Sequence, residues 1–184
     1  YTYIITSWQY LPLVGVDEEL LAEPETYEWL GYTVGKLHNT TNVKSLKLPR
    51  YDPMRWTDQR IRKLTDLGYP RSRQLQCETH RIKRALDTLT ADLPHVLLHG
   101  DIHLDNIAVN TNTGENILTD YESVCIGPAI GDLYPSAGWV KRTGMPTQDQ
   151  LDIYRQAYIS QTSTDPWEIN EEIFTILDTI RSLS

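Results

Sequence analysis

The fold is decided by the stretch Val96–Asp132, which reads VLLHGDIHLDNIAVNTNTGENILTDYESVCIGPAIGD. A short apolar run, Val96–Leu98, is followed by the polar cluster His99–Asn106, and a second apolar run, Ile107–Val109, comes directly after it. A turn around Gly114 then leads to a third apolar run. A Gly-containing loop of a few residues between two apolar runs predicts a β-hairpin. We therefore expect a buried strand, then a polar loop, then a hairpin.

The polar groups of this stretch are expected at one edge of a small sheet. Asp101, His103 and Asn106 lie in the loop before the hairpin, and Asp120 ends the strand after it. The carboxylates and the amide offer the hard oxygen ligands that a cation such as Mg²⁺ prefers. This arrangement is suited to holding a divalent cation and an incoming hydroxyl side by side.

The segment HGDIHLDN, followed by an apolar strand and Asp120, resembles the aminoglycoside phosphotransferases and their choline-kinase-like relatives. These are small-molecule kinases with a protein-kinase-like fold. From Asp101 to Asn106 the spacing is 106 − 101 = 5 residues, as between the catalytic Asp and the metal-binding Asn of the protein-kinase loop. The resemblance extends from the first residues to about Tyr158.

The resemblance implies a chemical role for four residues. Asp101 would accept the proton of the acceptor hydroxyl. His103 stands where the protein-kinase loop usually has Lys, and it would either donate to the transferred phosphate or serve the loop structurally. Asn106 and Asp120 would hold Mg²⁺ together with the nucleotide phosphates.

Three further residues are assigned supporting or open roles. His99 would prop the loop against the metal-binding segment, and Asp132 would accept hydrogen bonds from the backbone of the catalytic loop. Glu122 lies close to Asp120 in sequence, and metal contact, substrate contact and structural support stay open for it.

The beginning of the chain is expected to bind the nucleotide. Tyr1–Gln9 is rich in β-branched and aromatic residues and predicts a strand, which Tyr10–Gly15 interrupts. The resemblance makes this segment the hinge between two lobes, whereas without it an ordinary edge strand is the simpler interpretation. Backbone groups near the adenine of ATP, or of GTP in its place, would come from Ser7, Trp8, Gln9 and Tyr10.

The remaining sequence is dominated by helical patterns. Pro24 suits the first turn of a helix, and further helices are expected from about 52 to 67, through Leu75 and Leu89, over 150–158 and over 167–183. The predicted fold class is α+β, a protein-kinase-like C-terminal lobe that is mainly helical with a small catalytic hairpin. Residues 1–15 would be the hinge strand and connector, and 16–184 the catalytic lobe.

Within that lobe, substrate-side helices would span about 23–92 and 145–184, and the catalytic and metal loops about 96–132. The Gly-rich loop, the strand Lys and the helix Glu of an N-terminal lobe are absent from the 184 residues. We therefore expect a fragment that needs the missing lobe of the same protein. By itself it would transfer no phosphate and would tend to aggregate.

Composition narrows the class of partner. With 17 basic and 25 acidic residues the formal charge is −8, which argues against non-specific nucleic-acid binding. Residues 41–90 carry 12 − 5 = +7, and residues 145–184 carry 2 − 7 = −5. These biases are read either as solvated helix faces or as an acidic wall for a cationic substrate. No signal peptide or membrane-length run is evident, and the two cysteines match no metal spacing, so a cytoplasmic protein is expected.

The predicted function is transfer of the γ-phosphate of a nucleoside triphosphate to a hydroxyl of a small molecule. An aminoglycoside-type antibiotic, which would imply a resistance role, a macrolide, a choline-like alcohol and another metabolite all stay open as acceptor. A catalytically silent, pseudokinase-like binding module is the alternative. A metallophosphoesterase is rejected, because the further Gly-Asn-His and Gly-His-x-His ligand clusters are absent from the sequence.

Overall fold

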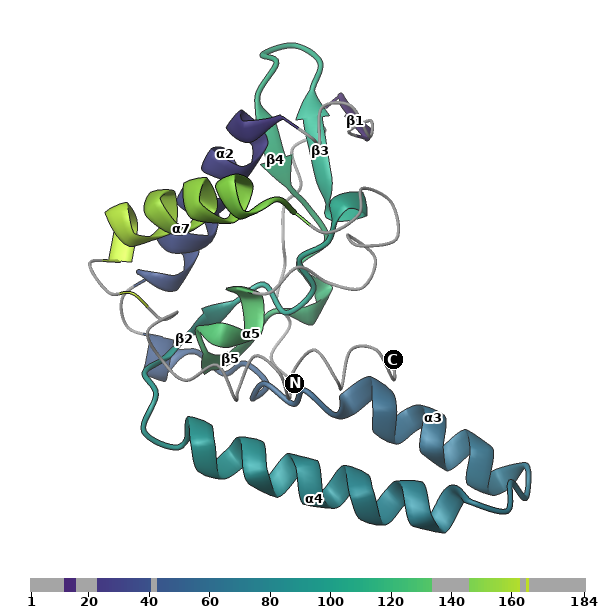
Figure 1. Ribbon diagram of the computed structural model, residues 1–184. Coiled ribbons are helices and arrows are strands. Elements are labelled where there is room, and N and C mark those ends of the chain that lie inside the picture. Colours follow the sequence, from purple (N-terminus) through teal and green to yellow (C-terminus); the bar gives the residue numbers. More distant parts are fainter. Residues whose placement is uncertain (1–11, 16–22, 41–42, 134–145, 163–164, 166–184) are drawn as a thin grey trace.

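The computed structural model describes residues 12–15, 23–40, 43–133, 146–162 and 165 of the 184-residue chain. The expected strand Tyr1–Gln9 and the expected helix over 167–183 lie outside these residues. The described part is a mixed α+β structure with two small antiparallel sheets and two pairs of helices, and the two-stranded sheet lies between the helix pairs (Figure 1). The predicted fold class is confirmed.

The predicted hairpin is present. Strands β3 (Ile107–Asn110) and β4 (Asn116–Leu118) pair antiparallel, with Ile107 opposite Leu118. Gly114 in the connecting turn has φ +73°, a left-handed conformation that glycine adopts without a steric penalty. The buried side chains of Ile107 and Leu118 attach the hairpin to the main core.

A third strand, β1 (Leu13–Gly15), adds to the outer edge of β3 in the order β1-β3-β4. The sequence analysis expected an interruption over Tyr10–Gly15, and for these three residues that expectation is wrong. All three are exposed, so no pattern of burial could mark them as a strand. Backbone pairing with β3 holds the segment, and Thr111 N–H donates to the Pro12 carbonyl at 2.9 Å.

The second sheet carries the start of the candidate loop. Strand β2 (His95–Leu98) pairs antiparallel with β5 (Cys125–Pro128), and Leu98 lies opposite Cys125. A short helix, α5 (Ile130–Leu133), follows β5 directly. The chain therefore enters the loop at His99 close to the segment that contains Asp132.

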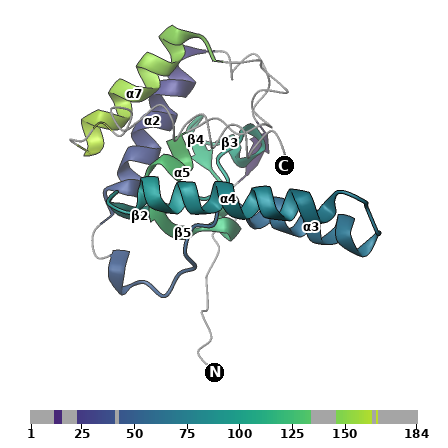
Figure 2. The same cartoon turned by 60° about the horizontal axis from the view of Figure 1, so that its bottom comes forward.

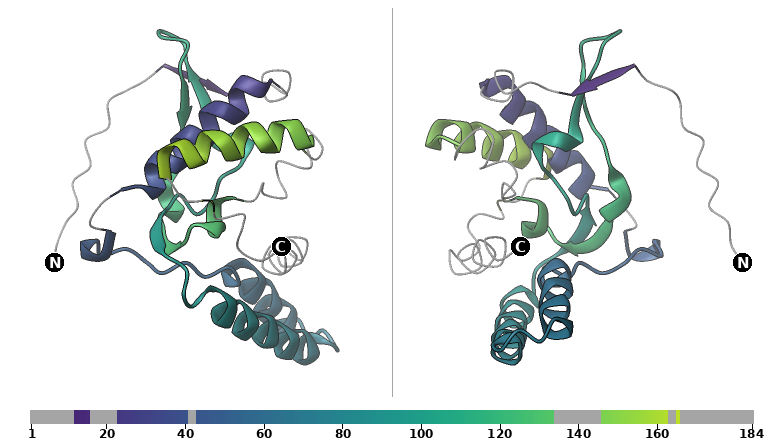
Figure 3. Two further views of the ribbon diagram at one scale, coloured as in Figure 1. Left: turned by 60° about the vertical axis from the view of Figure 1, so that its left-hand side comes forward. Right: turned by 90° about the vertical axis from the view of Figure 1, so that its right-hand side faces the viewer.

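Two helices form one side of the molecule. Helix α2 (Pro24–His38) begins at Pro24 as predicted, and α7 (Gln148–Thr162) extends beyond the predicted 150–158 at both ends. They lie side by side in Figures 1 and 3. The main core is built from their buried faces, the hairpin and the loop; its buried members are Tyr27, Leu30, Val34, Ile102, Ile107, Leu118, Leu133, Tyr154 and Tyr158.

The other helix pair, α3 (Arg55–Asp66) and α4 (Ser72–Thr90), lies along the opposite side and extends beyond the sheets in Figure 2. Helix α3 begins later than the expected residue 52 because Asp52 forms a turn: its side chain accepts from Met54 N–H at 3.2 Å and its carbonyl accepts from Arg55 N–H at 3.1 Å. A smaller core of Met54, Leu86 and Ile130 joins the pair to α5. None of the described helices is long and apolar enough to cross a membrane.

Candidate active site

The candidate catalytic loop leaves β2 through a sharp turn at Gly100. Its φ of +84° favours glycine, and a Cβ at this position would overlap the carbonyl oxygen of Ser123. Glycine therefore permits both the turn and the close approach of the 121–123 segment.

Asp132 holds the loop from behind. Its carboxylate accepts hydrogen bonds from the backbone N–H of His99 at 2.6 Å and of Gly100 at 2.9 Å. The residue is 3% exposed, and a buried carboxylate requires such donors because it has lost its water. These are the hydrogen bonds that the family resemblance led us to expect.

His99 connects the loop to the segment that ends in Asp120. It is fully buried, its Nε2 lies 2.8 Å from the carbonyl oxygen of Thr119, and its ring lies 4.6 Å from that of Tyr121. Since a carbonyl can only accept, Nε2 carries the hydrogen. The partners thus define the neutral tautomer, in which Nδ1 accepts from Asp101 N–H at 3.3 Å.

Asp101 and His103 face one another at the open side of the loop. His103 Nε2 lies 3.4 Å from Asp101 Oδ2, and Nδ1 lies 3.8 Å from the carboxylate of Asp105. The Asp101 side chain is 41% exposed and that of His103 is 25% exposed. Both groups are thus accessible to a ligand, and the imidazole lies between two carboxylates.

Asn106 is fixed so that one of its side-chain atoms is free. Its Nδ2 donates to the carbonyl of Asp101 at 2.9 Å and lies 3.1 Å from His103 Nε2, while its backbone carbonyl accepts from Thr119 N–H at 2.7 Å. Within the described residues, its Oδ1 accepts no hydrogen bond. An oriented amide oxygen of this kind fits a hard cation such as Mg²⁺.

Asp120 immediately follows Thr119, whose N–H and hydroxyl both donate to the backbone carbonyl of Asn106. Its backbone is left-handed, with φ 58° and ψ 62°, and it is the only described residue other than glycine with positive φ. Its exposed carboxylate makes no hydrogen bond to any described residue. Strained backbone of this type costs roughly 1–3 kcal/mol and is concentrated at functional sites. The donor set therefore fits a cation shared with a phosphate ligand, although in the described residues no group of three or more His, Cys, Asp or Glu is arranged so that it could hold a metal ion by itself.

Two residues of this assembly, His38 and Tyr158, were not identified as parts of the site from the sequence. His38 is the last residue of α2, and its buried imidazole lies 3.2 Å from Asp132 Oδ2 and 2.9 Å from the hydroxyl of Tyr158. The Leu-His pair at the helix end was the available signal. Nothing in the sequence indicated Tyr158.

The buried carboxylate of Asp132 affects its neighbours. Burial, reinforced by the negative charge of Asp132, raises the pKa of the Tyr158 hydroxyl and that of Tyr121. The same two causes raise the pKa of the Cys125 thiol to about 11. These groups therefore keep their protons at neutral pH.

Five other residues were named for the site from the sequence. Ser7, Trp8, Gln9 and Tyr10 lie outside the described residues. Glu122 is exposed, with no hydrogen bond or ion pair in the described part of the chain, and its role stays open.

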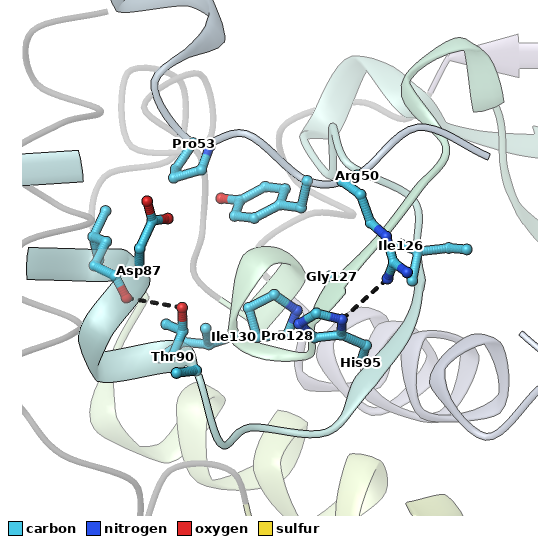
Figure 4. Close-up of a pocket in the computed structure, with 12 residues that line it drawn as sticks. Arg50, Pro53, Asp87, Thr90, His95, Ile126, Gly127, Pro128 and Ile130 are labelled. Carbon is cyan, nitrogen blue, oxygen red and sulfur yellow. Dashed lines mark hydrogen bonds between the residues drawn. The ribbon is translucent and has the colours of Figure 1, made fainter. Parts of the chain in front are cut away.

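A cavity of about 380 Å³ lies at the far end of β2 from the loop (Figure 4). Arg50 Nη1 lies 3.1 Å from His95 Nδ1 at one side of it, and Asp87 of α4 lies at another. His95 is exposed. The cavity contains none of the predicted site residues.

The chain matches one known protein family over most of its length. The family model described as "Phosphotransferase enzyme family" matches residues 7–167. No curated protein gives a significant match.

Solved structures share the fold at low sequence identity. An ethanolamine kinase of Plasmodium vivax matches with TM-score 0.67 and 13% identity, over 98% of this chain and 58% of its own. The choline kinase LicA of Streptococcus pneumoniae matches with TM-score 0.60 and 18% identity, over 95% and 59%. An aminoglycoside-3'-phosphotransferase of type VIII matches with TM-score 0.63 and 15% identity, over 96% and 67%. The chain thus spans less than two thirds of the length of the two kinases.

Proposed function

We propose, from the premise that this chain belongs to the phosphotransferase enzyme family, that it forms the catalytic part of a small-molecule kinase. The protein would move the γ-phosphate of ATP, or of GTP, to a hydroxyl of a small molecule. The enzyme would need nucleotide contacts from further residues, including the predicted hinge around Ser7–Tyr10 and an N-terminal lobe of the same protein. We also propose the division of the chain into hinge and catalytic lobe near residue 15.

One observation carries the proposal. The buried carboxylate of Asp132 fixes the loop from behind, and the partly exposed Asp101 lies on its open side. The Asn106 side chain donates to the Asp101 carbonyl, and its Oδ1 accepts no hydrogen bond within the described residues. The rigid backbone and the accessible carboxylate together are what positioning of a hydroxyl requires.

The proposed reaction is in-line phosphoryl transfer. The acceptor oxygen forms a bond to the γ-phosphorus while the bond from that phosphorus to the β–γ bridging oxygen breaks. Asp101 orients the acceptor hydroxyl and takes its proton, and the departing nucleoside diphosphate keeps the bond electrons. Charge and atoms balance without any covalent enzyme intermediate.

Asn106 and Asp120 would hold Mg²⁺, which when bound neutralises the phosphate charge. His103 would donate to the transferred phosphoryl group from its place beside Asp101. Its ring nitrogens lie 3.4 and 3.8 Å from the carboxylates of Asp101 and Asp105.

The acceptor we propose is a cationic amino alcohol. The related structures are a choline kinase, an ethanolamine kinase and an aminoglycoside phosphotransferase, and the acceptors in these names all carry a positively charged nitrogen. The net charge of −8, with −5 over residues 145–184, is compatible with a cation. Affinity for a polycationic acceptor should then fall as salt rises, since exposed charges are screened within about 10 Å at 0.1 M salt.

The test is a panel of acceptors assayed on the full-length protein with ATP and with GTP, following nucleoside diphosphate release and the phosphorylated product together. Choline, ethanolamine and aminoglycosides form the cationic set, and neutral sugar alcohols and macrolides form the comparison. We expect Mg²⁺-dependent product from the cationic set alone. Nucleotide binding without transfer to any acceptor would instead identify the silent, pseudokinase-like alternative.

A further inference from the structure

We propose that the cavity at the far end of β2 from the catalytic loop binds a small organic anion, namely a carboxylic acid with an apolar body. The cavity has a volume of about 380 Å³, which is within the usual range for ligand pockets. Its walls combine two exposed basic side chains, Arg50 and His95, with an apolar surface. The site is separate from the candidate active site, and the inference does not rest on the proposed function.

The two basic side chains have hydrogen-bond donors to spare. A guanidinium can only donate, so Arg50 Nη1 donates to His95 Nδ1 at 3.1 Å, and the imidazole carries its hydrogen on Nε2. Within the part of the chain that the structure describes, the other N–H groups of Arg50 and the Nε2–H of His95 make no hydrogen bond or ion pair. A charged fork beside a neutral N–H group is suited to binding a carboxylate.

Strand β5 holds the backbone on either side of Arg50. Tyr51 N–H donates to the Ile126 carbonyl at 2.9 Å, and Ile126 N–H donates to the Pro49 carbonyl at 2.8 Å. Ile126 is 4% exposed, so this attachment is made to the interior of the protein. The backbone of Arg50 is therefore fixed without using its guanidinium, and a site that is ordered before binding loses less entropy when a ligand enters.

The apolar part of the cavity wall is also fixed by close packing. A Cβ on Gly127 would overlap Tyr51 Cβ, and one on Gly131 would lie 3.2 Å from Tyr51 Cζ. Glycine at both positions therefore allows the tyrosine side chain to pack directly against β5 and α5. Further apolar side chains of the lining are Pro53, Leu86, Pro128 and Ile130. Burial against this wall stabilises a ligand that has an apolar body, and an inorganic anion would lack that contribution.

The charges around the cavity favour an anion over a cation. Asp87 lies on the side opposite Arg50 (Figure 4), but its carboxylate already has a cationic neighbour. The pKa of Lys83 is raised first by its hydrogen bond to Asp52 and further by the charge of Asp87. Arg50, in contrast, makes no ion pair with any described carboxylate. Residues 41–90 carry a net charge of +7, so the local potential also attracts an anion.

The experiment uses the full-length protein and four small probes. Hydrocinnamate has both the carboxylate and the apolar body, hydrocinnamamide and phenylpropylamine replace the carboxylate by a neutral and a cationic group, and acetate lacks the apolar body. Binding is followed by the shifts of the backbone amide signals of Gly127 and Ile130 in proton–nitrogen NMR spectra. We expect hydrocinnamate to bind with a Kd of about 0.1–1 mM, as suits a ligand of its size. The other three should bind at least about 10-fold more weakly.

Three variants locate the bound probe. Arg50→Gln removes the charge, so the Kd for hydrocinnamate should rise by about 10- to 100-fold, as for the loss of a hydrogen bond to a charged group. Lys47→Gln is the matched control, because it removes an exposed positive charge from the same segment at a residue that does not line the cavity. Its Kd should change by less than about 2-fold. Ala91→Leu extends a side chain that lines the cavity and should abolish binding while leaving both basic residues in place.

Several outcomes would overturn the inference. These are no binding of hydrocinnamate to the parent, equal affinity for the acid, the amide and the amine, and parent-like affinity in Arg50→Gln or Ala91→Leu. If Arg50→Gln does not fold, His95→Phe keeps a ring and removes the Nε2–H, and its Kd should rise by about 3- to 10-fold; an unchanged Kd overturns the inference. If the protein transfers phosphate to no acceptor while hydrocinnamate binds as expected, the proposed function fails and the anion site stands.

Discussion

The back and the front of the catalytic loop carry carboxylates in opposite environments. Behind the loop, Asp132 is 3% exposed and accepts three hydrogen bonds. In front of it, the Asp101 side chain is 41% exposed, and the exposed carboxylate of Asp120 makes no hydrogen bond to the described residues. Asp101 directly follows the His99–Gly100 backbone that Asp132 holds, yet the Asp132 carboxylate is bound by the protein and the carboxylates of Asp101 and Asp120 are left open to a ligand.

The difference shows how a rigid loop can present reactive groups. A carboxylate satisfied by backbone N–H groups fixes the path of those residues, whereas a carboxylate without protein partners keeps its lone pairs for a ligand. Structural and chemical roles are thus divided between different acids. Variants on either side should therefore fail in different ways.

The largest effect is expected on turnover, for a substitution of Asp101 on the open side of the loop. Asp101→Asn removes the proton acceptor and keeps the shape of the side chain, so turnover should fall by about 10²–10⁴-fold while nucleotide affinity barely changes. Steady-state kinetics and nucleotide titration on the full-length protein measure both quantities. Near-normal turnover would show that Asp101 has only a structural role, as Asp132 does, and would contradict the contrast between the two sides of the loop.

The next effect concerns the cation. Asp120→Ala should abolish Mg²⁺-dependent nucleotide binding, and Asn106→Ala should weaken it less, because a neutral amide attracts a cation less strongly than a carboxylate. Calorimetric titration of nucleotide with and without Mg²⁺ measures the difference. Asp120→Asn serves as control for conformation, since Asn tolerates the left-handed backbone. Parent-like affinity in all three variants would remove Asp120 from the metal site.

Behind the loop, substitution of Asp132 should lower the free energy of unfolding. Asp132→Asn replaces a buried, fully hydrogen-bonded carboxylate and leaves at least one donor facing an amide N–H₂, so the free energy of unfolding should fall by about 3 kcal/mol. Urea denaturation followed by circular dichroism measures it. Asp105→Asn, at an exposed acid of the same loop, should change stability by no more than about 0.5 kcal/mol. Equal losses in the two variants would contradict the division of roles.

The smallest effect tests the helix contact that supports the back of the loop. Gly31→Ala places a methyl group against the carbonyl oxygen of Tyr154, and the resulting overpacking should lower the free energy of unfolding by about 1–3 kcal/mol. Gly15→Ala, where an added Cβ meets no atom within 4 Å, is the matched control and should be close to neutral. If thermal denaturation found both variants equally stable, close packing of α2 on α7 would not be required.

Much of the fold could be predicted from short stretches of sequence, because turns, residue spacings and helix starts depend on neighbouring residues. The turn at Gly114, the spacing from Asp101 to Asn106 and the start of α2 at Pro24 each follow from the preferences of neighbouring residues. The hairpin, the strand before the loop and the fold class were therefore predicted correctly. The exposed strand β1 was missed because it exists only through hydrogen bonds to a partner about 95 residues away, at Ala108–Asn110.

Only the tertiary structure decided what stands behind the loop. His38 contacts the side chains of Asp132 and Tyr158, which lie 94 and 120 residues further along the chain. No spacing rule connects a helix end, a strand exit and a distant tyrosine, since their meeting depends on the packing of α2 against α7. The sequence by itself determined the reactive edge of the site, because those residues are neighbours in the chain, whereas the burial that holds the edge in place arises from contacts that form only when the whole core assembles.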